Sequence, residues 1–85
     1  MSEFHFAETA FDDYVYWQSQ DRKTLKKINR LLKDISRHPF EGEGKPEPLK
    51  GGAWSRRINE KDRIVYEVRN ETIYIKQCKG HYDDK

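Results

Sequence analysis

Four kinds of side chain that can act on a phosphodiester lie at well-separated positions in this chain of 85 residues. They are the carboxylate of Glu47, the guanidinium groups of Arg57 and Arg63, the imidazole of His81 and the phenol of Tyr82. Cleavage of RNA by its own 2′-hydroxyl needs a base for that hydroxyl, an acid for the 5′-oxygen, and cations for the charge on phosphorus. A fold that brings these groups together therefore has the parts for metal-free RNA cleavage.

Glu47 lies between Pro46 and Pro48, and this spacing bears on its orientation. Each proline fixes its own φ, and Pro48 also restricts the residue before it, so the carboxylate is held on a stiff segment. We therefore interpret Glu47 as the candidate general base. The alternative is an exposed loop glutamate, and the segment taken alone favours that alternative.

His81 and Arg63 are the other two candidates for the reacting centre. An imidazole can give or take a proton near neutral pH, so we interpret His81 as the general acid. Arg63 opens a strand-like run, and its planar fork can bind two phosphate oxygens at once. The alternatives are a histidine in a frayed chain end, and a surface ion pair of Arg63 with Glu60 or Asp62.

The remaining candidates would bind the substrate. Tyr82 offers a ring for base stacking and a hydroxyl for orientation, or else it packs the chain end onto the sheet. Arg57 is interpreted as a second phosphate-binding residue, and Lys50 as a cation beside the candidate base. Arg56 is included among the substrate-binding candidates, although strand alternation directs it toward the helices, where it would support the site or contact a partner.

Local patterns predict an α+β fold, with an N-terminal strand, a helical hairpin and a three-stranded antiparallel meander. The expected elements are a strand at 4–6, helices at 8–20 and 22–37, an irregular segment at 39–49, and strands at 54–58, 63–68 and 72–77. Asp21 is the expected N-cap of the second helix, and Pro39 ends that helix at His38. Packing both helices on one face of the sheet buries their apolar stripes.

Residue spacing also predicts which side chains face the core. Apolar residues recur every three or four positions in the helices and at every second position in the strands. The expected core residues are Ala7, Ala10, Phe11, Tyr14, either Trp17 or Gln18, Leu25, Ile28, Leu32, Ile35, Trp54, Ile58, Ile64, Tyr66, Val68, Ile73 and Ile75. Asp12 and Asp13 are expected to face away from the core. The helix-free face of the sheet then holds Ser55, Arg57, Arg63, Val65, Glu67, Tyr74 and Lys76. Such a face is either an RNA platform or an ordinary polar sheet face, and alternation alone favours the second.

Charge is distributed unevenly along the chain. Residues 22–79 carry 16 Lys and Arg against eight Asp and Glu, whereas residues 1–21 carry five acids and no Lys or Arg. The basic excess favours a polyanionic partner on one surface, although a solvated helix face would give a similar excess.

Length and residue types narrow the class of protein further. One domain, spanning 1–85, is expected at this length. The single cysteine, Cys78, allows no intramolecular disulfide, and the three histidines lack metal-ligand spacing, so we expect neither a metal site nor another cofactor. No segment approaches a membrane span and the N-terminus has no apolar signal-peptide run, so a cytoplasmic location without membrane association is expected.

Taken together, the motifs resemble the YoeB toxins of the RelE superfamily, from Phe11 to Tyr82. The matching segments, in the family's order, are Asp12-Asp13-Tyr14, Tyr16-Trp17-Gln18, Lys26-Lys27-Ile28-Asn29, Pro39-Phe40-Glu41-Gly42, Gly44–Lys50, Trp54–Ile58, Arg63, Val65-Tyr66 and His81-Tyr82. The resemblance implies a RelE-like fold and a type II toxin-antitoxin system. It also implies a ribosome-dependent endoribonuclease that cuts messenger RNA in the A site.

The resemblance assigns roles to the candidate residues. Glu47 matches the family's general base, His81 its general acid and Arg63 its transition-state clamp. Tyr82 matches the tyrosine that helps to position the substrate. Lys50 and Arg57 also match the family, as accessory cations.

The resemblance implies partners as well. They are messenger RNA and the ribosome with its ribosomal RNA, and a YefM-like antitoxin whose acidic segment covers the basic site. A second copy of the chain in a homodimer is also implied. Operator DNA is expected as a partner only through the toxin–antitoxin complex.

Two features depart from the family pattern. The segment Gly51-Gly52-Ala53 is shorter than expected for the family, which could shift Lys50. Asp83 and Asp84 follow the family's tyrosine, and their charge is expected to weaken phosphate binding somewhat. Neither feature removes a catalytic group.

Two other functions are alternatives to the nuclease. One is a non-catalytic RelE-like module that binds RNA or its antitoxin, and the other is a small basic structural domain. The candidate acid–base pair, Glu47 and His81, favours the nuclease because binding alone needs no titrating pair.

Overall fold

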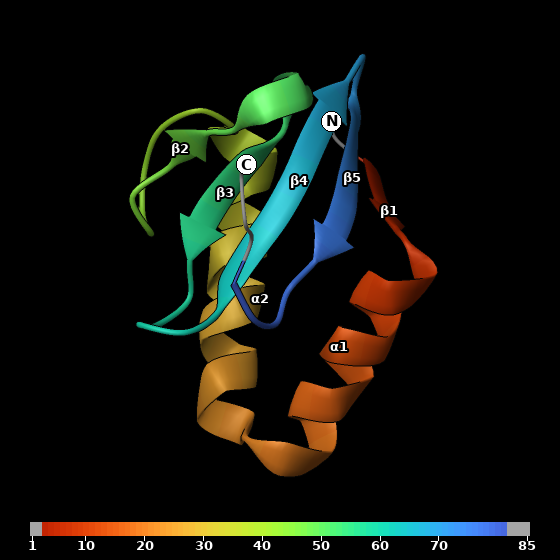
Figure 1. Ribbon diagram of the computed structural model, residues 1–85, viewed down its shortest axis with the longest axis vertical. Coiled ribbons are helices and arrows are strands. Elements are labelled where there is room, and N and C mark those ends of the chain that lie inside the picture. Colours follow the sequence, from red (N-terminus) through yellow and green to blue (C-terminus); the bar gives the residue numbers. More distant parts are fainter. Residues whose placement is uncertain (1–2, 82–85) are drawn as a thin grey trace.

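The order of helices and strands is what brings the candidate residues together. The computed structural model describes residues 3–81. Its elements are β1 (Glu3–Phe6), α1 (Glu8–Gln20), α2 (Arg22–Arg37), β2 (Glu47–Pro48), a 3₁₀ turn (Lys50–Gly52), β3 (Trp54–Arg57), β4 (Arg63–Arg69) and β5 (Thr72–Gln77). Figure 1 shows α2 passing behind β3 and β4. Residues of both helices pack with β4 and β5 in one buried core, so the helices lie on one side of the sheet.

The strands described here form one five-stranded sheet in the order β1-β5-β4-β3-β2. β3, β4 and β5 make the predicted antiparallel meander. β1 adds in parallel to β5, and β2 adds antiparallel to β3, where Glu47 pairs with Ser55. The sheet is therefore mixed and wider than the meander. The prediction that 39–49 is irregular throughout is wrong at Glu47 and Pro48, where the proline fits an edge strand that needs no N–H on its outer side.

Asp21 joins the two helices and is the reason that the hairpin needs almost no loop. Its backbone N–H donates to the carbonyl oxygen of Trp17 at 3.0 Å and closes α1. Its side chain accepts from the backbone N–H of Thr24 at 3.2 Å, which satisfies a donor that has no partner inside α2. The predicted cap is confirmed.

No helix within residues 3–81 has the length and apolar composition that crossing a membrane requires.

The core lies between the helices and the sheet. Its buried members are Ala10, Trp17, Ile28, Leu31, Leu32, Ile35, Ile58, Ile64, Tyr66, Ile73, Ile75 and Cys78. Two predictions about α1 are wrong. Phe11 is 55% exposed, and Asp13 does not simply face away, because its Oδ2 accepts from the backbone N–H of Cys78 at 3.1 Å. Trp17 Nε1 donates to the carbonyl oxygen of Cys78 at 2.9 Å, so α1 holds the chain just beyond β5.

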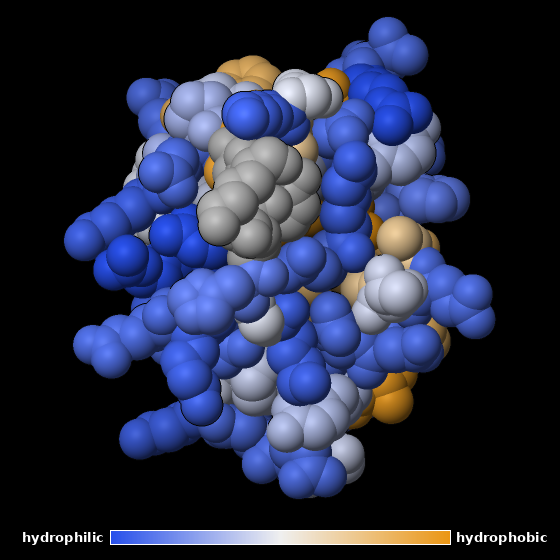
Figure 2. Space-filling model, in the orientation of Figure 1, coloured by the Kyte–Doolittle hydropathy of each residue, from blue (hydrophilic) through white to orange (hydrophobic). Residues whose placement is uncertain are grey.

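Among residues 3–81, no helix covers the other face of the sheet. Figure 2 views the molecule from this side and shows a largely hydrophilic surface. Three of the side chains predicted there, Glu67, Tyr74 and Lys76, contact other side chains of the sheet. Lys76 Nζ lies 2.5 Å from a carboxylate oxygen of Glu67, and the guanidinium of Arg69 lies 4.7 Å from the centre of the Tyr74 ring. The candidate phosphate ligands on this face therefore lie at the other end of β4, around Arg63.

Candidate active site

Arg63 is at the centre of the candidate site, and strands β2 and β3 supply its contacts. Register places Arg57 opposite Arg63 and Glu47 opposite Ser55, so these side chains share the helix-free face. Arg63 Nη1 donates to the Ser55 hydroxyl oxygen at 2.9 Å and lies 3.5 Å from Oε1 of Glu47. The Arg63 side chain is 23% exposed and that of Glu47 is 58% exposed. The guanidinium is thus held in place, while the carboxylate is open to a substrate.

Arg57 faces Arg63 across the antiparallel β3–β4 pair. Like charges at opposite positions destabilise a strand pair, so this pairing is more typical of an anion-binding face than of a structural one. Arg57 is exposed, and its backbone N–H donates to the carbonyl oxygen of Gly44 at 2.6 Å. Two guanidinium groups on adjacent strands beside a carboxylate provide the charges that binding a phosphodiester needs.

An irregularity at the end of β5 brings the backbone of His81 over the same face. The β4–β5 register shifts between Val65 and Tyr66, which is a β-bulge, and it pairs Gln77 with Val65. Gln77 therefore turns toward the helix-free face. There its side-chain amide donates to the backbone carbonyl oxygen of His81 at 3.2 Å. Simple alternation along β5 would direct Gln77 toward the helices, so the sequence pattern missed this contact.

Gly80 fixes the turn that precedes His81. Its φ of 83° lies in the left-handed region that favours glycine. Its N–H donates to Asp62 Oδ1 at 2.7 Å, and its carbonyl oxygen accepts from the backbone N–H of Arg63 at 3.1 Å. Asp62 therefore binds the chain end through its side chain, which differs from the ion pair with Arg63 considered as an alternative. These contacts hold the backbone before His81 beside Arg63, and the His81 side chain is exposed.

Other predicted features lie at the margin of the site or outside the described residues. Lys50 begins the exposed 3₁₀ turn that follows β2, directly before the segment Gly51-Gly52-Ala53. Tyr82, Asp83 and Asp84 lie outside the described residues. The stacking and charge effects expected of those three side chains therefore stay predictions.

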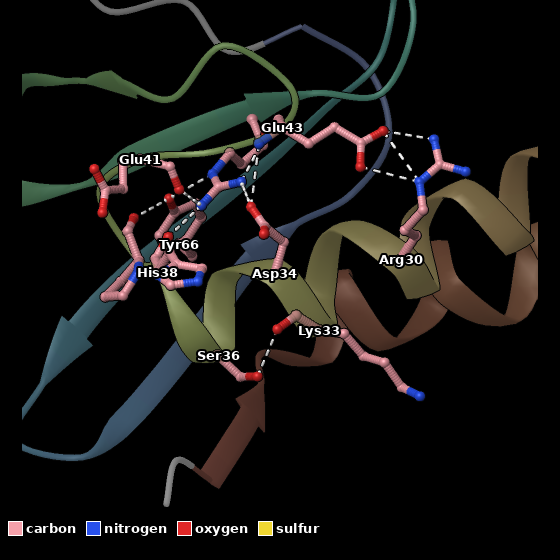
Figure 3. Close-up of polar contacts among 10 residues, drawn as sticks. Arg30, Lys33, Asp34, Ser36, His38, Glu41, Glu43 and Tyr66 are labelled. Atoms are coloured by element: carbon pink, nitrogen blue, oxygen red, sulfur yellow. Dashed lines mark hydrogen bonds and ion pairs between the residues drawn. The ribbon is translucent and has the colours of Figure 1, made fainter.

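Arg56 is not part of this surface, which corrects its inclusion among the substrate-binding candidates. Its side chain is completely buried, and its Nη1 lies 2.6 Å from Oδ2 of Asp34 on α2. Figure 3 shows Asp34 and Tyr66 beside the loop residues His38 and Glu41. The hydrogen bond from the Arg56 guanidinium holds the pKa of the Asp34 carboxyl below its ordinary value of 3.8. Arg56 therefore supports the structure behind the sheet and is closed to a substrate.

Asp34→Asn is expected to lower the free energy of unfolding at neutral pH by about 1.5–3 kcal/mol, because a charge-assisted hydrogen bond to a buried guanidinium is lost. The pKa of Asp34 is lowered in the folded state, so this stabilisation is present above the ordinary value of 3.8 and is lost as the pH falls through the folded value. The difference between wild type and variant should therefore be constant above about pH 5 and shrink below about pH 4. Urea titrations across this range measure it, and a difference of undiminished size at about pH 3 contradicts the assignment.

Cys78 and the remaining acidic and histidine side chains add little to the chemistry of this region. Burial raises the pKa of the Cys78 thiol to about 12, so it is protonated near neutral pH and is a poor nucleophile. Within residues 3–81, no three His, Cys, Asp or Glu side chains are grouped as the ligands of a metal ion would be. The described part of the site therefore offers a carboxylate, two guanidinium groups and the segment that carries an imidazole.

Comparison with known proteins places the chain in a family. Residues 6–82 match the family model of the YoeB-like toxin of the bacterial type II toxin-antitoxin system. The toxin YoeB of Escherichia coli K12 is 52% identical over 80 residues, which cover 91% of this chain and 95% of that protein.

Solved structures share the fold over almost the whole chain. The YoeB dimer from Staphylococcus aureus has a TM-score of 0.89 and 49% identity, covering 95% of this chain and 98% of that one. The heterotetrameric YoeB-YefM toxin-antitoxin complex from the same organism contains a chain with a TM-score of 0.87 and 49% identity, at 96% and 99% coverage. The architecture of β1, two helices and a five-stranded mixed sheet is therefore a RelE/YoeB-like fold. On both sequence and structure, this chain belongs to the YoeB family of toxins of type II toxin-antitoxin systems, within the RelE superfamily.

Proposed function

We propose that this toxin is an endoribonuclease that cuts messenger RNA in the ribosomal A site without a catalytic metal. One observation carries the proposal. The Arg63 guanidinium lies beside the Glu47 carboxylate at 3.5 Å, while the Arg63 backbone N–H holds the Gly80 carbonyl one residue before His81. This arrangement supports a site in which β2 would supply the base, β4 the cation and the segment after Gly80 the acid.

The proposed reaction transfers two protons and exchanges one bond at phosphorus. Glu47 takes the proton of the 2′-hydroxyl as that oxygen bonds to phosphorus, and the bond from phosphorus to the 5′-oxygen breaks. His81, in its protonated form, gives a proton to the departing 5′-oxygen. The products are a 2′,3′-cyclic phosphate and a 5′-hydroxyl. Each transfer by a positioned group is typically worth about 10²- to 10⁴-fold in rate.

The guanidinium groups would stabilise the charge that builds on the phosphate oxygens during this exchange. Arg63 is already oriented by Ser55, so it can hold two oxygens without first ordering its side chain. Arg57 is the exposed partner across the strand pair and would neutralise the same group. Lys50 is proposed to neutralise phosphate nearby, and Tyr82 to stack on a base.

The partners of the proposed toxin follow from its family and its charge. A solved relative is a complex of YoeB with YefM, and another is a YoeB dimer. We extend both to this chain, with a YefM-like antitoxin whose acidic segment covers the basic face, and with a homodimer. Ribosomal RNA would meet the basic surface during entry into the A site, and operator DNA would be bound only by the toxin–antitoxin complex.

The end groups of the cut messenger test the proposed function directly. The toxin is added to a reconstituted bacterial translation mixture with one defined messenger, and the fragments are analysed for their ends. We expect 2′,3′-cyclic phosphate and 5′-hydroxyl ends, with Arg69→Ala as a matched control, because Arg69 lies at the far end of β4 from Arg63. Ends that carry a 5′-phosphate contradict attack by the 2′-hydroxyl. An intact messenger with a toxin that still binds its antitoxin supports the non-catalytic alternative.

A further inference from the structure

The loop at 38–46 determines where the candidate base lies, yet none of its residues is buried and most are exposed. The loop leaves α2 after Arg37 and ends at Glu47, which pairs with β3 through a strand of two residues. Phe40, the large apolar side chain of the loop, packs against Trp54 but is 52% exposed. Polar contacts must therefore supply much of the stability of this loop.

The buried guanidinium of Arg56 supplies those contacts. An arginine has five N–H donors, and all five meet an acceptor here. The acceptors are the Tyr66 hydroxyl at 3.2 Å, Asp34 Oδ2 at 2.6 Å, and the carbonyl oxygens of Glu43 at 2.6 Å, His38 at 2.5 Å and Glu41 at 2.9 Å. The last three acceptors belong to the backbone of the loop. A lysine has three donors at a single point and could not span this set.

Tyr66 and Asp34 complete the same network. The Tyr66 hydroxyl donates to the carbonyl oxygen of Pro39 at 2.5 Å, and Asp34 Oδ2 accepts from the backbone N–H of Glu43 at 3.1 Å. Gly42 has a φ of 120°, and a Cβ at this position would lie 2.2 Å from Asp34 Oδ2. The loop therefore passes so close to the network that only glycine fits. No buried side-chain N or O atom among the described residues lacks a partner.

The network connects to the candidate base through a short stretch of chain. Arg56 lies on β3 between Ser55 and Arg57, with its side chain on the helix side, while those two neighbours face the candidate site. The Arg57 backbone N–H holds the carbonyl oxygen of Gly44, and Glu47 follows three residues later. One strand thus anchors the loop on its inner face and presents the candidate substrate site on its outer face.

We propose that Arg56, with Tyr66, is a positioning residue for the base. The Arg56 guanidinium and the Tyr66 hydroxyl hold the loop at 38–46 against β3, and this determines where the Glu47 carboxylate lies relative to Arg63. This proposal rests on the proposed nuclease function and deepens it. The network acts through the loop and does not touch the substrate.

A double-mutant cycle on cleavage tests the proposal. Single-turnover rates are measured on ribosomes that carry a defined messenger, for Tyr66→Phe and Arg56→Lys, each in the wild type and in a Glu47→Ala background. Because a base displaced by about 1 Å can cost about 10²-fold, we expect each variant to slow the wild type by about 10- to 10²-fold. In the Glu47→Ala background, where no base is left to misplace, each should change the rate less than twofold.

Tyr14→Phe is the matched control for Tyr66→Phe. It also removes one phenol hydrogen bond, from Tyr14 to Asn29 Oδ1 at 2.6 Å, but that bond joins α1 to α2 away from the loop. We expect wild-type cleavage from this control in both backgrounds. Tyr66→Phe keeps the ring in the core, so it carries the test if Arg56→Lys does not fold.

The outcomes separate this proposal from the one on which it rests. Equal slowing by Tyr66→Phe in both backgrounds overturns the positioning role, because the loss would then not pass through Glu47. Wild-type rates for Tyr66→Phe overturn it as well. A Glu47→Ala variant that cleaves as fast as the wild type instead overturns the assignment of the base, and the positioning role falls with it.

Discussion

His81→Ala is expected to slow messenger cleavage by about 10²- to 10⁴-fold, the usual contribution of a positioned general acid. The fold should not suffer. The His81 side chain is exposed, and the contact to Gln77 uses its backbone carbonyl, which alanine retains. Surface changes of this kind usually alter the free energy of unfolding by less than about 0.5 kcal/mol. Single-turnover cleavage on programmed ribosomes and a urea titration measure the two quantities on one preparation.

Two comparisons make the His81 result specific. His38→Ala removes an exposed imidazole at the end of α2 but keeps the backbone carbonyl that accepts from Arg56, so it should cleave like the wild type. His81→Ala should also retain binding to a YefM-like antitoxin and lose toxicity on expression. Growth arrest as strong as that caused by the wild type, with the fold intact, would show that His81 is not the acid.

Arg63→Ala is expected to lower the cleavage rate by about 10²- to 10³-fold, because it removes the cation that faces the developing charge. It should also lower the free energy of unfolding by about 1–2 kcal/mol, since the buried Ser55 hydroxyl loses its charged partner. The loss of rate is much larger than such a loss of stability can cause in a protein that remains folded. Cleavage and unfolding measured side by side separate the two effects.

Arg63→Lys divides the role of Arg63 into charge and geometry. A lysine keeps the positive charge but cannot hold two phosphate oxygens in the fork of a guanidinium. We expect a rate between those of the wild type and Arg63→Ala, with Arg69→Ala again as the surface control. If Arg63→Ala cleaves within about twofold of the wild type, Arg63 is not the clamp, and its contact with Glu47 is only structural.

Residue spacing and capping residues were sufficient to predict most of the fold. They were insufficient to predict the pairing of the two edge strands, β1 and β2. The helices follow from apolar spacing within a few turns and from the carboxylate of Asp21, so they were predictable without any tertiary contact. The parallel pairing of β1 with β5 joins the two ends of the chain, and nothing in either segment alone specifies that partner. β2 has two residues and includes Pro48, so it is too short to show any alternation.

The candidate site, like the fold, was predictable from the sequence only in part. Alternation along β3 and β4 was enough to place Arg57 and Arg63 on one face. It failed for Gln77, because a bulge shifts the phase of β5 by one residue, and a bulge has no reliable signature in side-chain spacing. It also gave no hint of the loop anchored by Arg56, because most of the acceptors there are backbone carbonyls, which every residue possesses.

Arg56 and Arg57 lie on opposite faces of β3, so we expect substitutions at these two residues to have different effects. Arg56 has no exposed surface, and removing its contacts would leave a buried charge without acceptors, which is costly. Arg57, the next residue, is exposed and can vary at little cost to the fold. Substitutions at Arg56 should therefore lower stability as well as displace the base, whereas substitutions at Arg57 should weaken substrate binding and leave the fold intact.

The most direct test of the central claim is a structure of this toxin on a ribosome whose A-site messenger carries a 2′-O-methyl group at the scissile nucleotide. The methyl group blocks the attack but leaves the reacting oxygen in place. We expect the Glu47 carboxylate near the 2′-oxygen, the His81 imidazole within about 2.6–3.2 Å of the 5′-oxygen, and Arg63 on the non-bridging phosphate oxygens. A scissile phosphate bound away from Arg63, with Glu47 and His81 both out of reach of it, would contradict the account.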